Sequence, residues 1–534
     1  MDKYLAKHWP HSSVSVSCRV YASKRRADEY KRLRLTAEGI QLSTVGPSSA
    51  TDVIPWLSIL GASESTRSIR HRFLSVYEGS EIDEEKEFIV YGCVFKPESA
   101  GYGGLLGALH LLAKTVLPAV FSASKPGNER MLVQWVFRCN DEDGDAVARR
   151  TVKAIRFLAD PRVKQSIKSA EKLLDPFGIL PPRKFMVLIN PAGGNGGAQQ
   201  TFEKEVAPML KQANVEVEQV ITREAGHATE ILAQVPLYQY ECIVAVGGDG
   251  LLSEMLQGLM GRKDWQQAIL QPLGIIPGGS GNGLSASLLS RANERFEALN
   301  AAYSLVKGCV QELDLFSATN GIGTTMFGFL SFEWAFIADM DIRSEQYRFM
   351  GDMRFFVATI LQIFGFGQTK YHGQLRYLLS HDKEPQPIKH HAMHQSGKAL
   401  AQQACISLRT EADDENWLEM DGPFYMFWSM NVSHAAADAY IAPPADIADG
   451  YFQIMLVSGE NYSRFGLAKL MMGIEKGSHI NEKRVQLIRT RAFSVRSSNA
   501  DDRMCIDGEP FQGPEVKIEM HRALGRVLCL PATK

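Results

Sequence analysis

Apolar and polar residues follow three different patterns along the 534-residue chain. Up to about residue 175, apolar residues alternate with polar ones in short runs, which is typical of half-buried strands. Residues 183–312 instead show short apolar strands that alternate with helical periods, and from residue 313 the segments are longer, β-like and rich in aromatic side chains. Residues 176–184 contain three prolines and are predicted to be a linker. The pattern therefore predicts three units.

The first unit, residues 1–175, is predicted to be a small β-rich domain. Strand-like runs occur at residues 14–20, 88–95 and 131–137, and residues 145–159 place apolar side chains on one face of a helix. Several antiparallel strands followed by one helix are typical of a pleckstrin-homology-like barrel. A regulatory role in docking to lipid or protein and a merely structural role both stay open, because a fold alone does not specify a function.

The second unit alternates strands and helices, which predicts a parallel sheet of Rossmann-like α/β type. The strands are expected at residues 185–190, 215–222, 242–246 and 273–276. Three of them end in glycine-rich turns, with the sequences PAGGNGG, GGDG and PGGSGNG. Because ligands bind at the carboxyl ends of strands in such sheets, the three turns are predicted to lie together on one rim.

Charge and composition narrow the classes of partner. The chain has 58 Lys plus Arg and 60 Asp plus Glu, which gives a net charge of −2 and argues against nucleic acid as a partner. The eight cysteines include no Cys-x-x-Cys pair and the chain shows no apolar signal segment, so a cytoplasmic protein with reduced thiols is expected. The most apolar stretches, residues 103–121 and 355–367, are interrupted or too short to span a bilayer, so any membrane contact is expected to be peripheral. The oligomeric state, including a homodimer, stays open.

The glycine-rich turns can support binding of a polyphosphate. The first turn lacks both the Gly-Lys-Ser/Thr ending of a Walker A loop and the spacing of a dinucleotide fingerprint, which leaves binding through unhindered backbone N–H groups at helix starts. The second turn contains Asp249, which is unfavourable beside phosphate unless it accepts a proton or holds Mg²⁺; a helix N-cap is the structural alternative. Glu254, five residues on, has a simple alternative as a favourable charge near a helix start.

In this order and at these separations, the three turns resemble the catalytic fold of the diacylglycerol kinase superfamily of lipid kinases. The motifs are NPAGGNGGA at residues 190–198, VGGDGLLSEMLQGL at 246–259 and IPGGSGNGL at 276–284. Downstream, residues 331–355, 473–479 and 505–511 resemble sphingosine kinases specifically. The resemblance implies a Rossmann-like nucleotide domain joined to an antiparallel β-sandwich lipid domain, residues 313–534, with ATP and Mg²⁺ bound in the cleft.

On the nucleotide side, the resemblance implies that Asp249 is the general base that activates the primary hydroxyl of a sphingoid base. It also implies a set of ATP-binding residues, of which the two arginines neutralise phosphates: Asn190, Thr222, Gly248, Glu254, Ser280, Gly281, Asn282, Arg348, Arg354, Gly508 and Glu509. Asp507 is a candidate metal ligand. From the residues alone, the two arginines could equally belong to a charged helix face, with Glu345 paired to Arg348.

On the lipid side, the resemblance implies that Ser331 and Asp341 hold a hydroxyl and the amine of the long-chain base. An ammonium group that leaves bulk water needs a carboxylate partner, which suits Asp341. The remaining matches are Phe336, Ile337 and Phe355 for the walls of the tail pocket and His479 for a polar residue near the lipid head. Without the resemblance these would be ordinary core residues and a surface histidine. Residues 355–367 are predicted to form an amphipathic lip through which lipid enters from a membrane surface.

The leading prediction is therefore an ATP-dependent kinase of sphingosine-like long-chain bases. A ceramide or diacylglycerol kinase of the same fold is the nearest alternative, and Asp341 favours an amine-bearing substrate over both. NAD kinase shares the GGDG turn but lacks the aromatic second domain. A non-catalytic lipid-binding scaffold is disfavoured by Asp249 and the two arginines.

Two further features of the sequence bear on the site. Ala192 and Gly197 replace basic residues that many sphingosine kinases carry in the first turn, so the effect on nucleotide affinity stays open. Residues 381–401 are rich in His, Gln, Lys and Pro and are predicted to form a flexible insertion without a metal site, because no Cys or carboxylate stands at ligand spacing.

Overall fold

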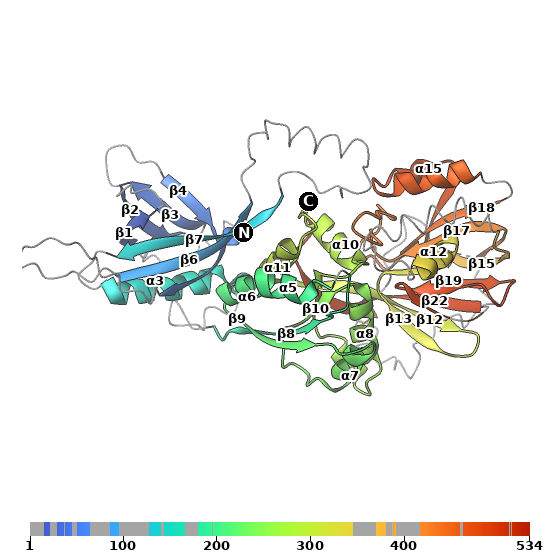
Figure 1. The fold of residues 1–534 in the computed structure, drawn as a ribbon, viewed down its shortest axis with the longest axis horizontal. Helices are drawn as coiled ribbons and strands as arrows, with labels where there is room; N and C mark the ends of the chain where they lie inside the picture. The colour runs from blue at the N-terminus through green and yellow to red at the C-terminus, as the bar shows by residue number, and fades with distance from the viewer. Residues whose placement is uncertain are drawn as a thin grey trace, which may run out of the picture.

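The computed structural model describes residues 15–21, 29–36, 38–44, 51–64, 86–95, 128–139, 144–165, 180–194, 196–344, 370–380, 387, 389–390, 417–459, 463–511, 513 and 515–533. An N-terminal sheet, an α/β domain and a β-sandwich follow one another along the longest axis of the molecule (Figure 1). In these segments, no helix is long and apolar enough to cross a membrane.

The N-terminal unit is a sheet of seven antiparallel strands in the order β4-β3-β2-β1-β7-β6-β5. The strands are β1 (Ser15–Tyr21), β2 (Glu29–Leu35), β3 (Gly39–Thr44), β4 (Thr51–Pro55), β5 (Ile59–Glu64), β6 (Lys86–Phe95) and β7 (Arg130–Cys139), with a short η1 (Trp56–Ser58) before β5. Helix α3 (Gly144–Ala159) packs on the sheet and is followed by α4 (Pro161–Gln165). Leu33, Phe88, Phe137 and Ile155 are fully buried between helix and sheet. The predicted strands and helix are present, and a pleckstrin-homology-like fold stays a prediction.

The α/β domain is built on four parallel strands in the order β9-β8-β10-β11. They are β8 (Arg183–Ile189), β9 (Val215–Ile221), β10 (Cys242–Gly247) and β11 (Leu273–Pro277). The helices are α5 (Ala198–Thr201), η3 (Phe202–Val206), α6 (Ala207–Gln212), α7 (His227–Gln234), α8 (Asp249–Met260), α9 (Trp265–Ala268), α10 (Gly283–Arg291) and α11 (Ala298–Lys307). Alternate strand residues bury both faces of the sheet: Phe185 and Val187 pack with α5, α6 and α11, whereas Met186 and Leu188 pack with α7 and α8. Because both of their faces are covered, β8, β10 and β11 are mainly apolar, whereas the edge strand β9 (VEVEQVI) is largely exposed.

The C-terminal domain is a mainly antiparallel β-sandwich. Its strands are β12 (Cys309–Asn320), β13 (Thr325–Gly328), β14 (Ser331–Ala335), β15 (Gly373–Leu379), β16 (Trp417–Asp421), β17 (Phe424–Met430), β18 (Phe452–Ser458), β19 (Val485–Ser497), β20 (Met504–Ile506), β21 (Glu509–Pro510) and β22 (Glu515–Cys529). An aromatic core with edge-to-face contacts, including Phe332 against Phe427 and Phe493, fills the space between the sheets. A second apolar cluster includes residues of α12 (Phe336–Ser344) and α15 (Arg464–Ile474), near η6 (Ser478–Asn481).

One long strand joins the sandwich to the α/β domain. β22 pairs antiparallel with β12 from Cys529 to Val516, and Val527 near its end lies beside Leu273 of β11 in parallel register. A single hydrogen-bonded sheet therefore runs through both domains. Gly308 stands where the chain leaves α11 for β12, and a Cβ there would lie 2.3 Å from the backbone of Cys529. Only glycine fits this close crossing.

The N-terminal sheet contacts the α/β domain through side chains instead. Arg130 of β7 forms a buried ion pair with Glu294, at 2.6 Å between Nη2 and Oε1. Lys307, at the end of α11, donates from Nζ to the carbonyl oxygens of Trp56 and Ala159, at 3.2 and 2.7 Å. The sheet is therefore held on the helices of the α/β domain by buried polar contacts.

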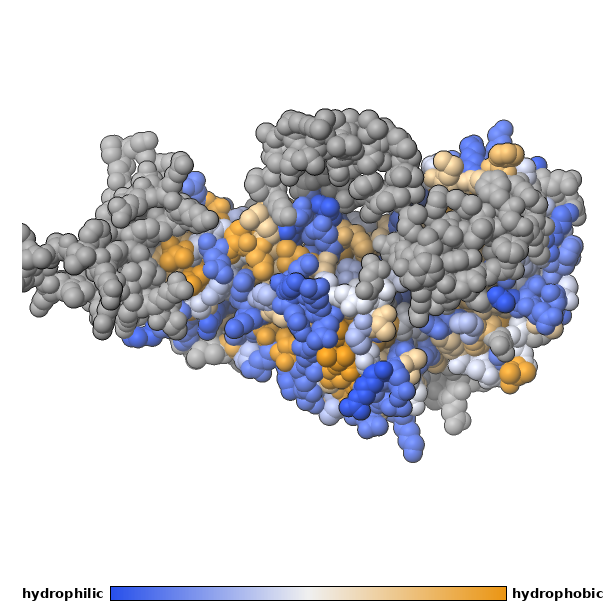
Figure 2. All heavy atoms as spheres, in the orientation of Figure 1, coloured by the Kyte–Doolittle hydropathy of each residue, from blue (hydrophilic) through white to orange (hydrophobic). Residues whose placement is uncertain are grey.

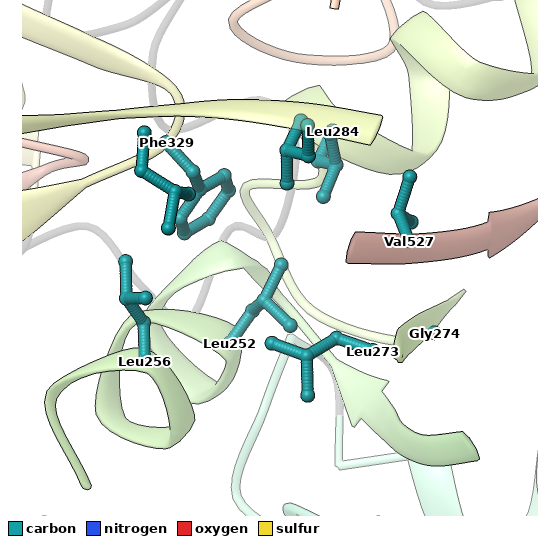
Figure 3. A pocket seen from close by; sticks show the side chains of 9 residues that line it. Leu252, Leu256, Leu273, Gly274, Leu284, Phe329 and Val527 are labelled. Atoms are coloured by element: carbon teal, nitrogen blue, oxygen red, sulfur yellow. The ribbon is translucent and has the colours of Figure 1, made fainter. Parts of the chain in front are cut away.

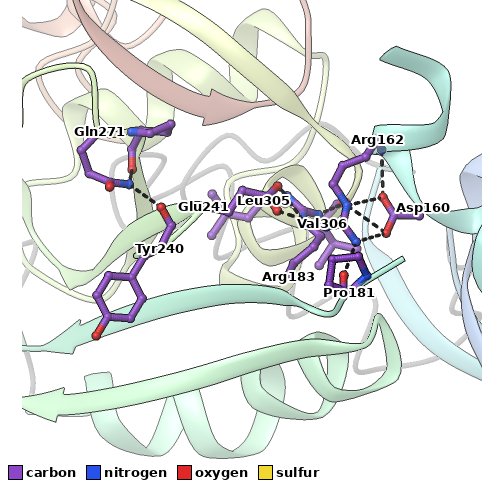
Figure 4. Close-up of polar contacts among 10 residues, drawn as sticks. Asp160, Arg162, Pro181, Arg183, Tyr240, Glu241, Gln271, Leu305 and Val306 are labelled. Atoms are coloured by element: carbon purple, nitrogen blue, oxygen red, sulfur yellow. Dashed lines mark hydrogen bonds and ion pairs between the residues drawn. The ribbon is translucent and has the colours of Figure 1, made fainter. Parts of the chain in front are cut away.

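The junction between α4 and β8 is tied by two arginines (Figure 4). Arg162 donates to the carboxylate of Asp160 (2.7 Å) and to the carbonyl oxygen of Pro181 (2.8 Å). Arg183, at the start of β8, pairs with Glu241 (2.7 Å) and donates to two carbonyl oxygens of α11. These contacts fix the end of the predicted linker where it enters the parallel sheet.

The predicted flexible insertion at residues 381–401 is described only at Pro387, Lys389 and His390. Lys389 pairs with Glu312 at 2.7 Å, the carbonyl oxygen of Pro387 accepts from Arg522 at 2.6 Å, and His390 is buried. His390 is therefore docked on the folded domains, and the expectation of a solvated loop is wrong for it, whereas Lys389 is exposed. The other residues of the insertion lie outside the described part of the chain.

Candidate active site

The turns that follow β8, β10 and β11 meet at one edge of the parallel sheet. The N–H of Gly278 donates to the carbonyl of Gly247 (3.1 Å) and the N–H of Asp249 donates to the carbonyl of Gly281 (2.9 Å), so the second and third turns are directly bonded. A Cβ at Gly194 in the first turn would lie 3.1 Å from the carbonyl oxygen of Gly278, which places the first turn beside the third. The strand order reverses between β8 and β10 at this edge, the usual ligand crevice of such sheets.

Glycine is required where the turns touch. A Cβ at Gly279 would lie 2.4 Å from the backbone of Gly248, and one at Gly248 would lie 2.6 Å from the carbonyl oxygen of Gly281. A Cβ at Gly197 would instead meet nothing within 4 Å. The close approach brings backbone N–H groups and the starts of α8 and α10 to one place, and this arrangement favours binding of phosphate groups.

Asp249 is the first residue of α8 and is only 4% exposed. Its carboxylate accepts hydrogen bonds from the N–H of Gly283 (2.5 Å) and the N–H of Leu284 (3.2 Å), so it caps α10, the helix after the third turn. Gly248 is the N-cap of α8, so the alternative that Asp249 caps its own helix is wrong. Burial raises the pKa of Asp249 to about 6, and the two backbone donors oppose the rise. Such a carboxylate is ionised at pH 7 and still accepts a proton readily, which suits a general base.

Two other predicted nucleotide residues follow the neighbouring strands. The side-chain oxygen of Asn190, after β8, accepts from the N–H of Ala192 (3.0 Å). The hydroxyl of Thr222, after β9, donates to the carbonyl of Ile189 (3.2 Å) and is buried. Both side chains shape the strand ends at the crevice, and their contacts with nucleotide stay a prediction.

The third turn is stiffened by its own asparagine. The side chain of Asn282 donates to the carbonyl of Gly279 (2.6 Å) and accepts from the N–H of the same residue (3.3 Å). Ser280 and Gly281 lie between them and are half-buried. The turn is therefore held in one shape before any ligand binds.

Glu254 of α8 contacts a neighbouring helix, and the IDGE turn lies against the start of α8. The carboxylate of Glu254 accepts from the N–H of Ala228 (3.2 Å) and so caps the start of α7. Glu509, next to Gly508, has a carboxylate oxygen 3.3 Å from where a Cβ at Gly250 would stand. The late turn therefore returns to the start of α8, as the resemblance implied.

Asp507 lies in the same turn, close to Asp249. Its carboxylate accepts from the N–H groups of Phe329 (3.0 Å), Leu330 (2.8 Å) and Ser331 (3.0 Å), so it holds the start of β14. Burial raises the pKa of Asp507 to about 7, and the charge of Asp249 adds to the rise. In the described segments, no three His, Cys, Asp or Glu side chains gather to hold a metal ion. Mg²⁺ commonly needs only one or two carboxylates beside phosphate oxygens, and Asp249 with Asp507 fits that smaller requirement.

The predicted lipid-side residues gather on the outer face of β14 and β17. Ser331 is fully buried and donates to Glu333, while Phe336 and Ile337 belong to the apolar cluster that includes residues of α12 and α15. His479 is also buried and bonds through Nε2 to the carbonyl of Ile441 (2.8 Å). It is therefore not the surface histidine of the alternative interpretation.

Several predicted residues lie wholly or partly outside the described part of the structure. Asp341 lies in α12, but its side chain is outside the described part of the structure. Arg348, Arg354, Phe355 and the predicted lip at residues 355–367 are outside the described residues altogether. Their roles stay predictions.

Sequence reasoning missed two polar residues on the lipid side, Glu333 and Trp428. They are 5% and 6% exposed, and their positions are paired across β14 and β17. The signal available was a lone carboxylate inside an otherwise apolar run, FLSFEWAFIA at residues 329–338. A charged residue at a buried position is uncommon enough to mark a site.

A small apolar cavity lies where the α/β domain meets the sandwich (Figure 3). It is lined by residues of both domains: Leu252, Leu256, Leu273, Gly274, Leu284, Leu313, Leu315, Phe329 and Val527. These side chains offer no hydrogen-bonding group, so the cavity does not suit a phosphate or a lipid head group. Figure 3 shows Leu252 and Leu256 pointing into it from the helix that begins with Asp249.

Two family models match the chain. Residues 184–318 match the diacylglycerol kinase catalytic domain, and residues 392–528 match the YegS C-terminal NAD kinase beta sandwich-like domain. The first match contains the three glycine-rich turns and Asp249, and the second contains the IDGE turn.

Curated relatives match the same region. Sphingosine kinase 1 of Arabidopsis thaliana is 33% identical over 325 residues, which cover 58% of this chain and 64% of the relative. Sphingosine kinase 2 of the same plant is 31% identical over 362 residues, 66% of this chain and 72% of the relative. Sphingosine kinase 1 of Homo sapiens is 31% identical over 356 residues, 65% of this chain and 91% of the relative.

Proposed function

The chain belongs to the sphingosine kinase family, and we propose on this basis that it is an ATP-dependent lipid kinase. Its reaction is the transfer of the terminal phosphoryl group of ATP to the primary hydroxyl of a sphingosine-like long-chain base, which gives the base 1-phosphate. The observation that carries the proposal is the place of Asp249, a buried carboxylate where three glycine-rich turns meet. A carboxylate beside a phosphate site is costly unless the reaction uses it.

In this reaction Asp249 accepts the proton of the attacking hydroxyl. The N–H groups of Gly283 and Leu284 occupy one lone pair on each carboxylate oxygen and fix its orientation, and the other lone pairs remain for the substrate. The N–H groups of the turns hold the phosphoryl oxygens in line with the attacking oxygen and stabilise the charge that spreads over them. The raised pKa of Asp249 makes the proton transfer easier than it would be to an exposed aspartate.

ATP and Mg²⁺ are the proposed cofactors. The turns present backbone donors at close range instead of bulky side chains, which suits a triphosphate. Bound Mg²⁺ would neutralise charge on the phosphate oxygens, and Asp249 and Asp507 are the carboxylates that would hold it. Arg348 and Arg354 are proposed to add positive charge from the opposite side.

The lipid is proposed to bind on the outer face of β14 and β17. Ser331 and Asp341 take a hydroxyl and the amine of the long-chain base, and Phe336, Ile337 and Phe355 line its tail. The described part of this cluster is rich in methionine, with Met340, Met426, Met430 and Met455 buried in it. Methionine side chains are flexible, so the cluster can rearrange around an inserted chain.

The kinase is proposed to work at a membrane surface, since its lipid substrate resides there. Helix α15, which packs over the lipid-side cluster, exposes Phe465 and Met472 at 80% and 82%, next to the exposed side chain of Lys469. Figure 2 shows apolar side chains at the outer edge of the molecule where α15 lies. Exposed apolar groups beside a basic residue are typical of a helix that lies on a bilayer.

The N-terminal unit is proposed to be a pleckstrin-homology-like docking or regulatory module. Its seven-stranded antiparallel order and single covering helix support this fold. The buried ion pair of Arg130 and Glu294 supports a fixed position on the α/β domain.

A substrate panel with labelled ATP tests the proposal. Purified full-length protein should phosphorylate sphingosine, dihydrosphingosine or phytosphingosine, and not ceramide or diacylglycerol. The Asp249→Asn variant should lose about 10²- to 10⁴-fold in kcat, the usual contribution of a general base, while still binding ATP. Asp446→Asn, which changes a half-exposed aspartate paired with Arg291, is the matched control and should keep its activity. Activity of Asp249→Asn at the level of the unmodified protein would exclude the general base.

A further inference from the structure

The loop at residues 431–442 follows β17 and lies between the lipid-side cluster and the start of α10. Ile441 is buried in that apolar cluster, and Ala439 packs against it. On the other side of the loop, a Cβ at Gly283, the first residue of α10, would lie 2.7 Å from the carbonyl oxygen of His434. The loop therefore contacts both the lipid-side cluster and the helix whose start holds the proposed base.

Contacts within the loop keep its shape. The N–H of Ala442 donates to the carbonyl of Ser433 at 3.1 Å, which closes the loop near its ends. The ring of His434 stacks on that of Tyr440, with 4.5 Å between the ring centroids. Burial lowers the pKa of His434 to about 4, so the ring is uncharged at pH 7. The backbone of the loop is therefore held in a fixed position against α10.

A chain of hydrogen bonds runs from this loop to the proposed base. The N–H of His434 donates to Oγ of Ser287 (3.0 Å), and the hydroxyl of Ser287 donates to the carbonyl oxygen of Gly283 (2.8 Å). That carbonyl and the N–H of Leu284 are the two ends of one planar peptide group. The N–H of Leu284 donates to the carboxylate of Asp249 at 3.2 Å. A single peptide group therefore separates Ser287 from the proposed base.

The direction of the chain gives Ser287 its importance. Every group in it donates towards Asp249, so each hydrogen bond polarises the next one and strengthens the last donor. A helical serine commonly bonds to the carbonyl four residues before it, and that bond alone concerns only the helix. Here the same hydroxyl also accepts from a loop of the sandwich, and Ser287 is only 2% exposed. Ser287 therefore joins the two domains beside the proposed base.

We infer that Ser287 is a positioning residue for the proposed catalytic base, because it joins the lipid-side loop to the peptide group that orients Asp249. The inference rests on the proposed function and deepens it by naming the side chain that aligns the base with the lipid side. Asp249 is proposed to take a proton from a hydroxyl that the lipid side presents, so its position relative to that side affects the rate. Ser287 acts only through the peptide group and does not touch the reacting atoms.

Ser287→Ala tests this role, with initial rates measured on labelled ATP and the most active of sphingosine, dihydrosphingosine and phytosphingosine. The variant should lose about tenfold in kcat, the effect of one lost buried hydrogen bond. The KM for ATP should stay within about threefold, because the contacts between the glycine-rich turns are unchanged. Alanine favours helix, so the variant is expected to fold, and urea unfolding checks that it is folded under the conditions of the assay.

Two further variants separate the hydroxyl from packing. Ser287→Thr keeps a hydroxyl that can reach the same carbonyl, so it should keep kcat within about threefold of the unmodified protein. Ser285→Ala is the matched control in the same helix, because the hydroxyl of Ser285 is buried and bonds to no described residue. It should leave kcat unchanged.

Three outcomes would overturn the inference: a kcat of Ser287→Ala equal to that of the unmodified protein, an equal loss in Ser287→Thr, or an equal loss in Ser285→Ala. Phosphorylation of none of the three long-chain bases by the unmodified protein would overturn the proposed function itself, and the inference with it.

Discussion

The two sides of the proposed active site are built from different parts of the chain. On the nucleotide side, the site is formed mainly by backbone groups. Three turns touch through glycine, and one carboxylate lies among them. On the lipid side, the polar groups are side chains on the face of a sheet: Ser331 donates to Glu333, and Trp428 stands opposite Glu333. The nucleotide side therefore fixes backbone shape, whereas the lipid side can change its specificity through single side chains.

The largest effect is expected when the contact between two glycine-rich turns on the nucleotide side is disrupted. Gly279→Ala places a Cβ 2.4 Å from the backbone of Gly248, and neither turn has a flexible side chain that could move away. Overpacking of this kind costs about 1–3 kcal/mol, so kcat/KM for ATP should fall by about tenfold to 100-fold. ATP titration of initial rates measures the loss.

Gly197→Ala is the matched control in the first turn, because a Cβ there meets nothing within 4 Å. It should keep kcat/KM within about threefold of the unmodified protein, since a substitution without a steric conflict usually changes little. Equal losses in the two variants would mean that the contact between the turns does not matter.

The second prediction concerns Glu333 on the lipid side and its effect on the free energy of unfolding. Burial raises the pKa of Glu333 to about 7, with Asp507 adding to the rise, so the folded protein holds this proton more tightly than the unfolded chain. The stability from this group is present below the ordinary glutamate range and is lost as the pH rises towards 7. Glu333→Gln does not titrate, so it should match the unmodified protein at pH 4.5 and exceed it by about 3 kcal/mol at pH 8. Urea unfolding at both pH values tests this difference.

Glu333→Gln and the unmodified protein share all other buried carboxylates, so the difference between their free energies of unfolding reports on Glu333. Glu419→Gln is the control at a half-exposed carboxylate and should show no pH-dependent gain. If Glu333→Gln and the unmodified protein differed by the same free energy of unfolding at both pH values, the raised pKa of Glu333 would be contradicted.

The difference between the nucleotide side and the lipid side also explains which features could be predicted from the sequence. Glycine-rich turns at the ends of apolar strands are local in sequence, so their meeting at one edge followed from the alternation of strands and helices. The partner of Asp249 did not follow, because Gly283 is 34 positions away and the capping of α10 depends on how the turns pack. Glu333 and Trp428 are 95 residues apart in the sequence, and their pairing depends on the register of β14 with β17, so it could not be predicted from the sequence.

A third prediction uses pH to probe the nucleotide side. Asp249 must be ionised to accept a proton, and burial raises its pKa to about 6. The rate should therefore be nearly constant above pH 7 and fall about tenfold for each unit below 6. The measurement is kcat/KM for the lipid between pH 5 and 8, with protein stability checked at each value. A flat profile down to pH 5 would contradict a base of this kind.

The smallest expected effect tests how the two sides are joined. Gln257 of α8 donates to the carbonyl of Phe327 (2.6 Å) and accepts from its N–H (3.2 Å), so one side chain links the helix of Asp249 to β13 of the sandwich. Gln257→Leu keeps the size but leaves both backbone groups without that partner, which should cost about 1–2 kcal/mol in unfolding free energy. Because the glycine turns and the lipid-side residues are untouched, the preference between long-chain bases should stay as it was and kcat should fall at most about fivefold. Gln267→Leu, at an exposed position of α9, is the control and should change neither quantity. If Gln257→Leu altered the preference between bases, the two sides would be coupled through this link, and the division between a backbone half and a side-chain half would no longer hold.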